Sequence, residues 1–188
     1  TRIWHITCVM YYRTGTGGGT EMTPKEARSI AEQVALAAVK YGDLSNQASK
    51  DYIFDVEKFS SSEGDTGPYI LYTIARIKSI LRKYEEQGGS RDKTMLREAC
   101  SGGEKGLMLE LAGFQAMITA ACEETAPHKI CAYMYNLANA LNRFYHETKI
   151  LTEEDEKKKA GWIGLLALTA DVLETCIDLL GFSAPERM

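Results

Sequence analysis

The chain lacks a hydrophobic run long enough to cross a membrane. None of its uninterrupted apolar stretches approaches the roughly 18 residues that a spanning helix needs, and the stretch 161–168 is too short. The first residues mix Arg2, His5 and Thr7 with apolar side chains, and no small-residue cleavage site follows, which is unlike a signal peptide. These absences predict a cytoplasmic protein that does not enter a membrane.

Paired cysteines and metal-binding histidines are also missing. The five cysteines are scattered, and no Cys-x-x-Cys pair occurs, which is typical of reduced thiols in a cytosolic protein. The three histidines, His5, His128 and His146, stand in no metal-ligand spacing, and no nucleophile has a recognisable base beside it. We therefore expect no metal, no cofactor and no catalytic residue in this chain.

Phosphate-loop signals are absent from the glycine-rich stretch 15–20, which has no Gly-Lys-Ser/Thr ending. Residues 1–22 are therefore expected to be an irregular segment or linker. They are either foreign to the natural protein or a divergent remnant of a preceding domain's end. The ordered domain is expected to span residues 23–188.

The net charge of −4 argues against a generally basic surface for nucleic acid. It permits a local basic face, because phosphate contacts need lysine and arginine in one place rather than a positive total. The chain is 45% hydrophobic and 26% charged, which is an ordinary globular composition and enough to form one core.

Apolar residues recur at helical spacing along most of residues 23–188. A capping box at Thr23 with proline in the first turn predicts where the first helix begins, and Gly181 is a predicted C-cap of the last. The expected helices span 24–41, 66–87, 106–124, 127–148 and 152–181. Five helices and no alternating strand predict an all-α bundle.

One helix face combines aromatic and basic residues. Tyr69, Tyr72 and Arg76 are spaced three and four residues apart and so share a face. Lys78, Arg82 and Lys83 add positive charge further along the same helix. The face is either the edge of the core with solvated charges, or a platform on which unpaired bases stack. The pattern alone favours the first interpretation.

Several motifs, in the same order along the chain, resemble the C-terminal anticodon-binding domain of the arginyl-tRNA synthetases. These enzymes are class I aminoacyl-tRNA synthetases, and this domain is of the DALR type. The resemblance runs in order from about residue 23 to 188, so it is more specific than any single motif. The matching runs are 39–45, 51–55, 63–77, 127–138, 142–145 and 179–188.

The resemblance implies a helical bundle of the class I synthetase anticodon-binding type, which grips the anticodon stem and loop of arginine tRNA. It places Tyr69, Tyr72, Arg76, Tyr145 and the C-terminal Met188 at the RNA surface. Splayed-out anticodon bases need aromatic faces and polar groups that read their edges.

Polar contacts are also expected from Asn142 and, more weakly, from Arg143, which lie within one helical turn of Tyr145. A helical protein-interaction module without RNA affinity is the alternative, favoured by the net negative charge and the acidic segment 153–156.

The sequence departs from the family at three places. Ser62 stands where the family usually has Phe, which removes an apolar anchor, and Asp65 stands where Asn is common. Trp162 and Gly164 occupy a stretch that often includes a basic residue, so a basic contact is expected to be absent there.

The family's catalytic signatures do not occur in the chain, so it should not aminoacylate tRNA by itself. The resemblance assigns ATP and magnesium to a separate catalytic domain of the full-length protein, which is also an expected partner of this domain. We expect the protein to act as a monomer.

Overall fold

The computed structural model describes residues 23–188. Residues 1–22 lie outside the described part, so the linker and the domain boundary predicted there stay predictions. Within the described part the fold is entirely helical, which confirms the all-α prediction. Its elements are α2 (Pro24–Leu44), α3 (Val56–Phe59), α4 (Gly67–Glu86), η2 (Lys93–Met95), α5 (Gly102–Ala112), α6 (Phe114–Glu123), α7 (Pro127–Glu147), η3 (Ile150–Thr152) and α8 (Glu156–Leu179).

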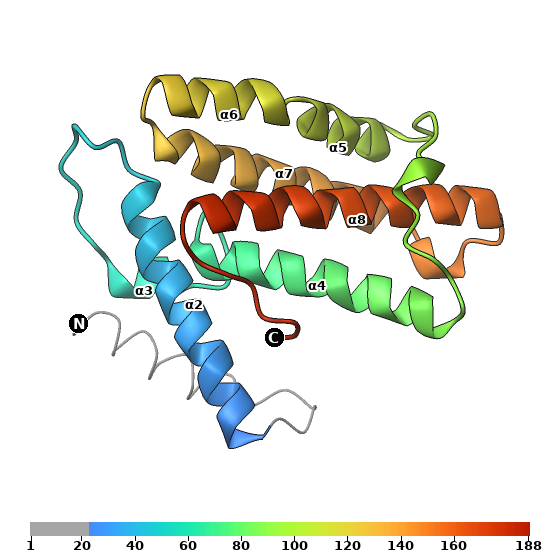
Figure 1. Ribbon diagram of the computed structural model, residues 1–188, viewed down its shortest axis with the longest axis horizontal. Helices are drawn as coiled ribbons and strands as arrows, with labels where there is room; N and C mark the ends of the chain where they lie inside the picture. Colours follow the sequence, from blue (N-terminus) through green and yellow to red (C-terminus); the bar gives the residue numbers. More distant parts are fainter. Residues whose placement is uncertain (1–22) are drawn as a thin grey trace.

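The long helices α4, α7 and α8 lie side by side and form the centre of the bundle (Figure 1). Helices α5 and α6 pack on α7 as an outer layer, while α2 crosses α4 at the end of the bundle where α4 begins. The core consists mainly of the apolar residues that the helical period places inward, such as Ile74, Leu141 and Leu173, which are buried almost completely.

Side-chain caps define where the main helices start. The Thr23 hydroxyl accepts a hydrogen bond from the Glu26 amide at 3.3 Å, and the Glu26 carboxylate accepts one from the Thr23 amide at 3.0 Å. This confirms the predicted capping box. Thr66 caps α4 by accepting from the Tyr69 amide at 3.2 Å. The cap therefore fixes the start of the helix that carries the aromatic face.

The last helix also ends as expected. Gly181 has φ +78°, and its amide donates to the Asp178 carbonyl at 2.9 Å, while the Phe182 amide donates to the Ile177 carbonyl at 3.0 Å. These are the two hydrogen bonds of a Schellman motif, in which glycine adopts the left-handed conformation at little cost.

Two predicted helix boundaries are wrong. The segment 106–124 is two helices, because the chain breaks at Gly113, whose amide donates to both the Leu109 and Glu110 carbonyls. Glycine favours such a break, since it costs a helix interior about 1 kcal/mol relative to alanine. The last helix begins at Glu156 rather than near residue 152, because Asp155 provides the cap and residues 150–152 form a separate 3₁₀ turn.

Helix α8 is strongly apolar, although the sequence contains no long uninterrupted hydrophobic run. By length and composition it could span a membrane, with a mean hydropathy of 1.5 over its most apolar window, but 72% of that window is buried inside the bundle. Glu174 and Asp171 interrupt the run, while the remaining side chains of the helix provide much of the core. The apolar character of α8 is thus explained by its central position (Figure 1).

A buried tyrosine ties three parts of the bundle together. The Tyr41 hydroxyl lies 2.5 Å from the Asp65 carboxylate and 2.9 Å from the Cys131 carbonyl. The ring is completely buried, and burial together with Asp65 raises the pKa of Tyr41 far above its usual value. The carboxylate at position 65 therefore has a specific partner, in addition to lying near the start of α4.

We expect Tyr41→Phe to lower the free energy of unfolding by about 1 kcal/mol, because it removes the buried hydroxyl that donates to the Asp65 carboxylate and to the Cys131 carbonyl. Urea denaturation followed by circular dichroism measures this change. Tyr52→Phe is the control, since the Tyr52 hydroxyl bonds Asp43 at an exposed position. Equal stabilities of the two variants would show that the buried hydrogen bonds contribute nothing.

Candidate nucleic-acid interface

Helices α4 and α7 bring five of the six predicted site residues together. We call the set Tyr69, Tyr72 and Arg76 on α4 with Asn142 and Tyr145 on α7 the tyrosine–arginine face. The two helices run in the same direction in the bundle (Figure 1), so residues later in α4 meet residues later in α7. Positions 69 and 145 are far apart in sequence, and only this parallel packing places them on one surface.

Arg76 stands at the centre of the face. Its guanidinium carbon lies 5.0 Å from the ring centre of Tyr145 and 5.9 Å from that of Tyr72, within cation–π distance of both. One of its nitrogens also donates to the Asn142 side-chain oxygen. Arg76 therefore holds two aromatic rings from two helices in a fixed relation.

The two rings beside Arg76 remain open to solvent. Tyr72 is 46% exposed and Tyr145 is 38% exposed, although both lie on helices that pack into the core. An exposed aromatic ring can stack on an unpaired base of any kind, because every base has a flat π-face. Both rings are thus open enough to stack on a base, and their role as a platform stays a prediction.

Tyr69 differs from them, because it is half-buried and fully hydrogen-bonded. Its hydroxyl donates to the Asn139 side-chain oxygen at 3.1 Å and accepts from the Asn142 amide. Its ring meets that of Tyr135 edge-on at 6.0 Å. Burial first, and Tyr135 second, raise the pKa of Tyr69 above its usual value. Tyr69 thus remains neutral and orients Asn142, which in turn holds Arg76.

Tyr135 and Asn139 extend this network, although neither was predicted from the sequence. The missed signal was the helical period on α7, since positions 135, 139 and 142 follow i, i+4 and i+7 and so form one stripe. Arg143 falls outside that stripe. It pairs instead with Glu147 at 3.1 Å, and its side chain is largely exposed.

The C-terminal tail is held in place by charged contacts. Lys78 lies 2.7 Å from Glu174 on α8 and 2.7 Å from Glu186 in the tail, and Arg187 lies 2.9 Å from Glu26 on α2. Met188 is partly buried and packs against the core rather than standing free. Within residues 23–188, it takes no part in the contacts that join the tyrosine–arginine face.

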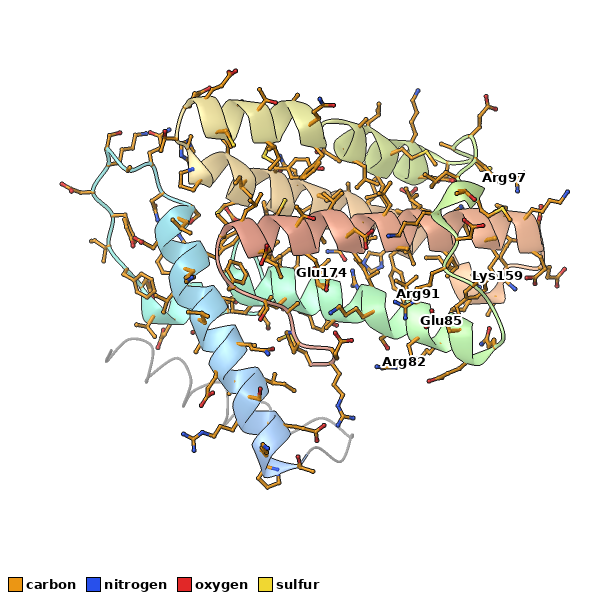
Figure 2. The ribbon with its side chains drawn as sticks, viewed as in Figure 1. Arg82, Glu85, Arg91, Arg97, Lys159 and Glu174 are labelled. Carbon is orange, nitrogen blue, oxygen red and sulfur yellow. The ribbon has the colours of Figure 1, made fainter. Side chains whose placement is uncertain are left out.

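The basic residues further along α4 have different roles. Burial alone would lower the pKa of Lys78, but its hydrogen bonds to the carboxylates of Glu174 and Glu186 raise it, so this lysine stays charged and its charge is already paired within the domain. Arg82 and Lys83 are exposed. Figure 2 shows Arg82 on the C-terminal half of α4, where Glu85 pairs with Arg91 at 2.6 Å. Lys83 follows Arg76 by seven residues, which places it on the same side of the helix.

The other departures from the family lie away from the tyrosine–arginine face. Ser62 is exposed, and the Thr66 hydroxyl holds the same turn by donating to the Ser61 carbonyl at 2.6 Å. Trp162 is a core residue, 7% exposed, whose ring meets Phe144 edge-on at 6.1 Å. Trp162 therefore contributes to packing, and the absence of a basic contact from this stretch stays a prediction.

Metal and thiol chemistry find little support in residues 23–188. No group of three or more His, Cys, Asp or Glu side chains in this part of the chain could hold a metal ion. Burial raises the pKa of Cys131 and of Cys176 to about 12, so both thiols are protonated and unreactive at neutral pH.

Comparison with known proteins agrees with this geometry. An arginine–tRNA ligase of Agathobacter rectalis is 66% identical over 165 residues, which is 87% of this chain and 28% of that protein. The corresponding ligase of Alkaliphilus oremlandii is 51% identical over 166 residues, or 88% of this chain and 28% of the relative. The chain thus spans little more than a quarter of the length of these relatives.

A solved structure shows the same fold. The arginyl-tRNA synthetase of Thermus thermophilus matches with a TM-score of 0.86 and 27% identity, covering 100% of this chain and 32% of its own. The structure of the Plasmodium falciparum enzyme has a TM-score of 0.81 at 24% identity, covering 100% and 33%, and supports the fold alone. The bundle is therefore of the class I synthetase anticodon-binding type, as the sequence predicted.

A helical bundle that exposes two aromatic rings around an arginine has the features of a module that reads unpaired RNA bases. The family model described as the DALR anticodon binding domain matches residues 70–188, which is more than half of the chain. The chain belongs to this family.

Proposed function

We propose that this domain binds the anticodon stem and loop of arginine tRNA, as part of an arginine–tRNA ligase. The observation that supports the proposal most directly is the pair of exposed rings, Tyr72 and Tyr145, which both lie within cation–π distance of Arg76. The relatives are arginine–tRNA ligases, which indicates arginine as the amino acid, and the family indicates the anticodon as the part of the tRNA that is bound.

The chemistry of the face suits single-stranded RNA. Anticodon bases can leave their stack and present flat faces, which aromatic rings cover at about 1–3 kcal/mol per base. Arg76 supplies a charged, planar group beside those rings, and Asn139 and Asn142 supply polar groups of the kind that bond base edges. A duplex would hide these edges, so the face favours the loop over the stem.

The remaining parts of the function stay predictions. In a full-length ligase, ATP and magnesium would be held by a catalytic domain, which would also be a partner of this domain, and residues 23–188 alone would be inactive in aminoacylation. We expect the protein to be cytoplasmic. We also expect it to be a monomer, and light scattering tests this oligomeric state. Met188 stays a predicted contact with the RNA. It ends the C-terminal tail, which the ion pair between Lys78 of α4 and Glu186 holds against the domain.

Filter binding with arginine tRNA and a non-cognate tRNA tests the proposal. We expect tighter binding of arginine tRNA and a steep loss of affinity with added salt, because each neutralised phosphate releases counterions. Equal affinity for both tRNAs would contradict specific recognition. Absence of binding even at low salt would favour the alternative, a helical protein-interaction module without RNA affinity.

Lys83→Ala is expected to reduce by about 1 the slope of the logarithm of the binding constant against the logarithm of salt concentration, if Lys83 contacts one phosphate. No ion pair within residues 23–188 occupies Lys83, so its charge is free for RNA. Lys129→Ala is the matched control, because Lys129 is already paired with Glu124. A slope changed equally by both variants would mean that general charge, rather than position, governs binding.

A further inference from the structure

A pocket adjoins the tyrosine–arginine face at the end of α7. Its volume is about 350 Å³, and it is lined by Tyr145 and His146 of α7, by Ile80 of α4 and by the turn that includes η3. Figure 1 shows that α4 and α7 end at the same end of the bundle, where the chain turns into α8. Pockets that bind small ligands start at about 300 Å³, so this one fits one nucleotide rather than a helix or a long peptide.

The walls of the pocket have two kinds of chemistry. Ile80 and Ile150 are buried and give it an apolar base, and the rings of Tyr145 and His146 stand 6.3 Å apart at an angle of 70°. Polar groups come from Thr148, Lys149 and Thr152, which line the pocket. Flat apolar faces with polar edges are the features of a nucleobase.

Tyr145 connects this pocket to the tyrosine–arginine face, because it lines the pocket and also contacts Arg76 at 5.0 Å. A base stacked at Tyr145 would therefore have its neighbour in the strand close to the pocket. No other residue of the tyrosine–arginine face lines the pocket. The two sites are thus adjacent and share a single wall.

The charge around the pocket is suitable for a phosphate group. Lys149 is exposed and joins no ion pair within the described part of the chain. Two of the neighbouring acids are paired, Glu147 with Arg143 at 3.1 Å and Glu153 with Lys158 at 2.9 Å, whereas Glu154 follows the pocket residues and joins no ion pair within residues 23–188. Among the described residues that line the pocket itself, Lys149 is the only lysine, arginine, aspartate or glutamate.

We infer that this pocket is a second nucleotide subsite, which takes the anticodon-loop nucleotide next to the one stacked at Tyr145. The base enters between Tyr145, His146 and the aliphatic residues, and Lys149 contacts the phosphate that links the two nucleotides. The inference rests on the proposed function, and it extends recognition beyond the exposed rings to a position held inside a pocket.

Thr152→Trp tests the subsite by filling it, since Thr152 lines the pocket but is exposed and forms no part of the core. The probe is a synthetic arginine anticodon stem–loop with 2-aminopurine placed at one loop position at a time. With the unchanged protein, we expect two neighbouring positions to change fluorescence at saturation. Thr152→Trp should abolish the change at one of them and weaken binding by about 5- to 150-fold, the loss of one stacked base.

Thr119→Trp is the matched control, because Thr119 is an exposed threonine on α6, away from α4. It should leave the affinity and both fluorescence changes as they are, and thermal melting by circular dichroism should show all variants folded. Fluorescence unaffected by Thr152→Trp at every position would overturn the subsite, while binding lost in Tyr72→Ala would still support the proposed function. If the unchanged protein binds no stem–loop, the proposed function itself fails.

Discussion

Replacing Tyr145 with alanine is expected to weaken the binding of arginine tRNA by about 5- to 150-fold, the equivalent of the 1–3 kcal/mol that one stacked base contributes. The ring is 38% exposed, so its truncation leaves no large cavity in the core. It also removes the cation–π partner of Arg76 that lies at 5.0 Å. Titration of labelled arginine tRNA at fixed salt measures the effect.

Tyr52→Ala is the control for this experiment. Tyr52 is 37% exposed, nearly the same as Tyr145, but it lies in the connection between α2 and α3, with its hydroxyl bonded to Asp43 at 2.6 Å. Its truncation should cost some stability through the lost contact with Phe59, and should leave the affinity for tRNA unchanged. Similar losses of affinity in both variants would assign the effect to the fold rather than to the tyrosine–arginine face.

A double-mutant cycle separates the two roles that Arg76 can have. If Arg76 mainly holds Tyr145 in place, the variant with both residues changed to alanine should bind almost as well as Tyr145→Ala alone. If Arg76 contacts RNA directly, the two losses should add. Because Arg76 also bonds Asn142, its change should in addition loosen Tyr69, which shares that asparagine.

The sequence predicted those parts of the fold that depend on local chemistry. The cap at Thr23 and the reversal at Gly181 need only neighbouring residues, and both are confirmed. The break at Gly113 was missed, because the apolar period continues through it, while its amide donates to the end of α5 and its carbonyl accepts the Met117 amide at the start of α6. At Gly113 the apolar period favours a continuous helix and the glycine favours a break, and both α5 and α6 pack on α7 in the folded domain.

The site was predictable only in part, because its contacts join distant segments. Tyr69 and Asn142 are 73 residues apart, and nothing in the sequence shows that they bond. The long-range partners of Lys78 were equally hidden, so its charge was counted as available when Glu174 and Glu186 already occupy it. Resemblance to a family named most of the tyrosine–arginine face, whereas the supporting residues Tyr135 and Asn139 emerged from the packing of α4 on α7.

Gly67→Ala is expected to cause the largest loss of stability among these variants, lowering the free energy of unfolding by about 3 kcal/mol. A Cβ atom at this position would lie 2.3 Å from the Ala37 carbonyl oxygen and 2.5 Å from its carbon. Those atoms belong to the backbone of α2, so they cannot move aside as the end of a side chain would. Urea denaturation followed by circular dichroism measures the loss.

Gly106→Ala is the matched control, because the same substitution is expected to raise the stability of the domain there. Gly106 lies inside α5, and a Cβ atom there would meet nothing within 4 Å, so alanine should stabilise the domain by about 0.5–1 kcal/mol. A loss at position 67 no greater than the change at position 106 would show that α2 and α4 separate freely.

Gly67→Ala should also affect function, since Gly67 begins α4 two residues before Tyr69. A displaced α4 would carry Tyr72 and Arg76 away from Tyr145, so Gly67→Ala should weaken tRNA binding even where the protein remains folded.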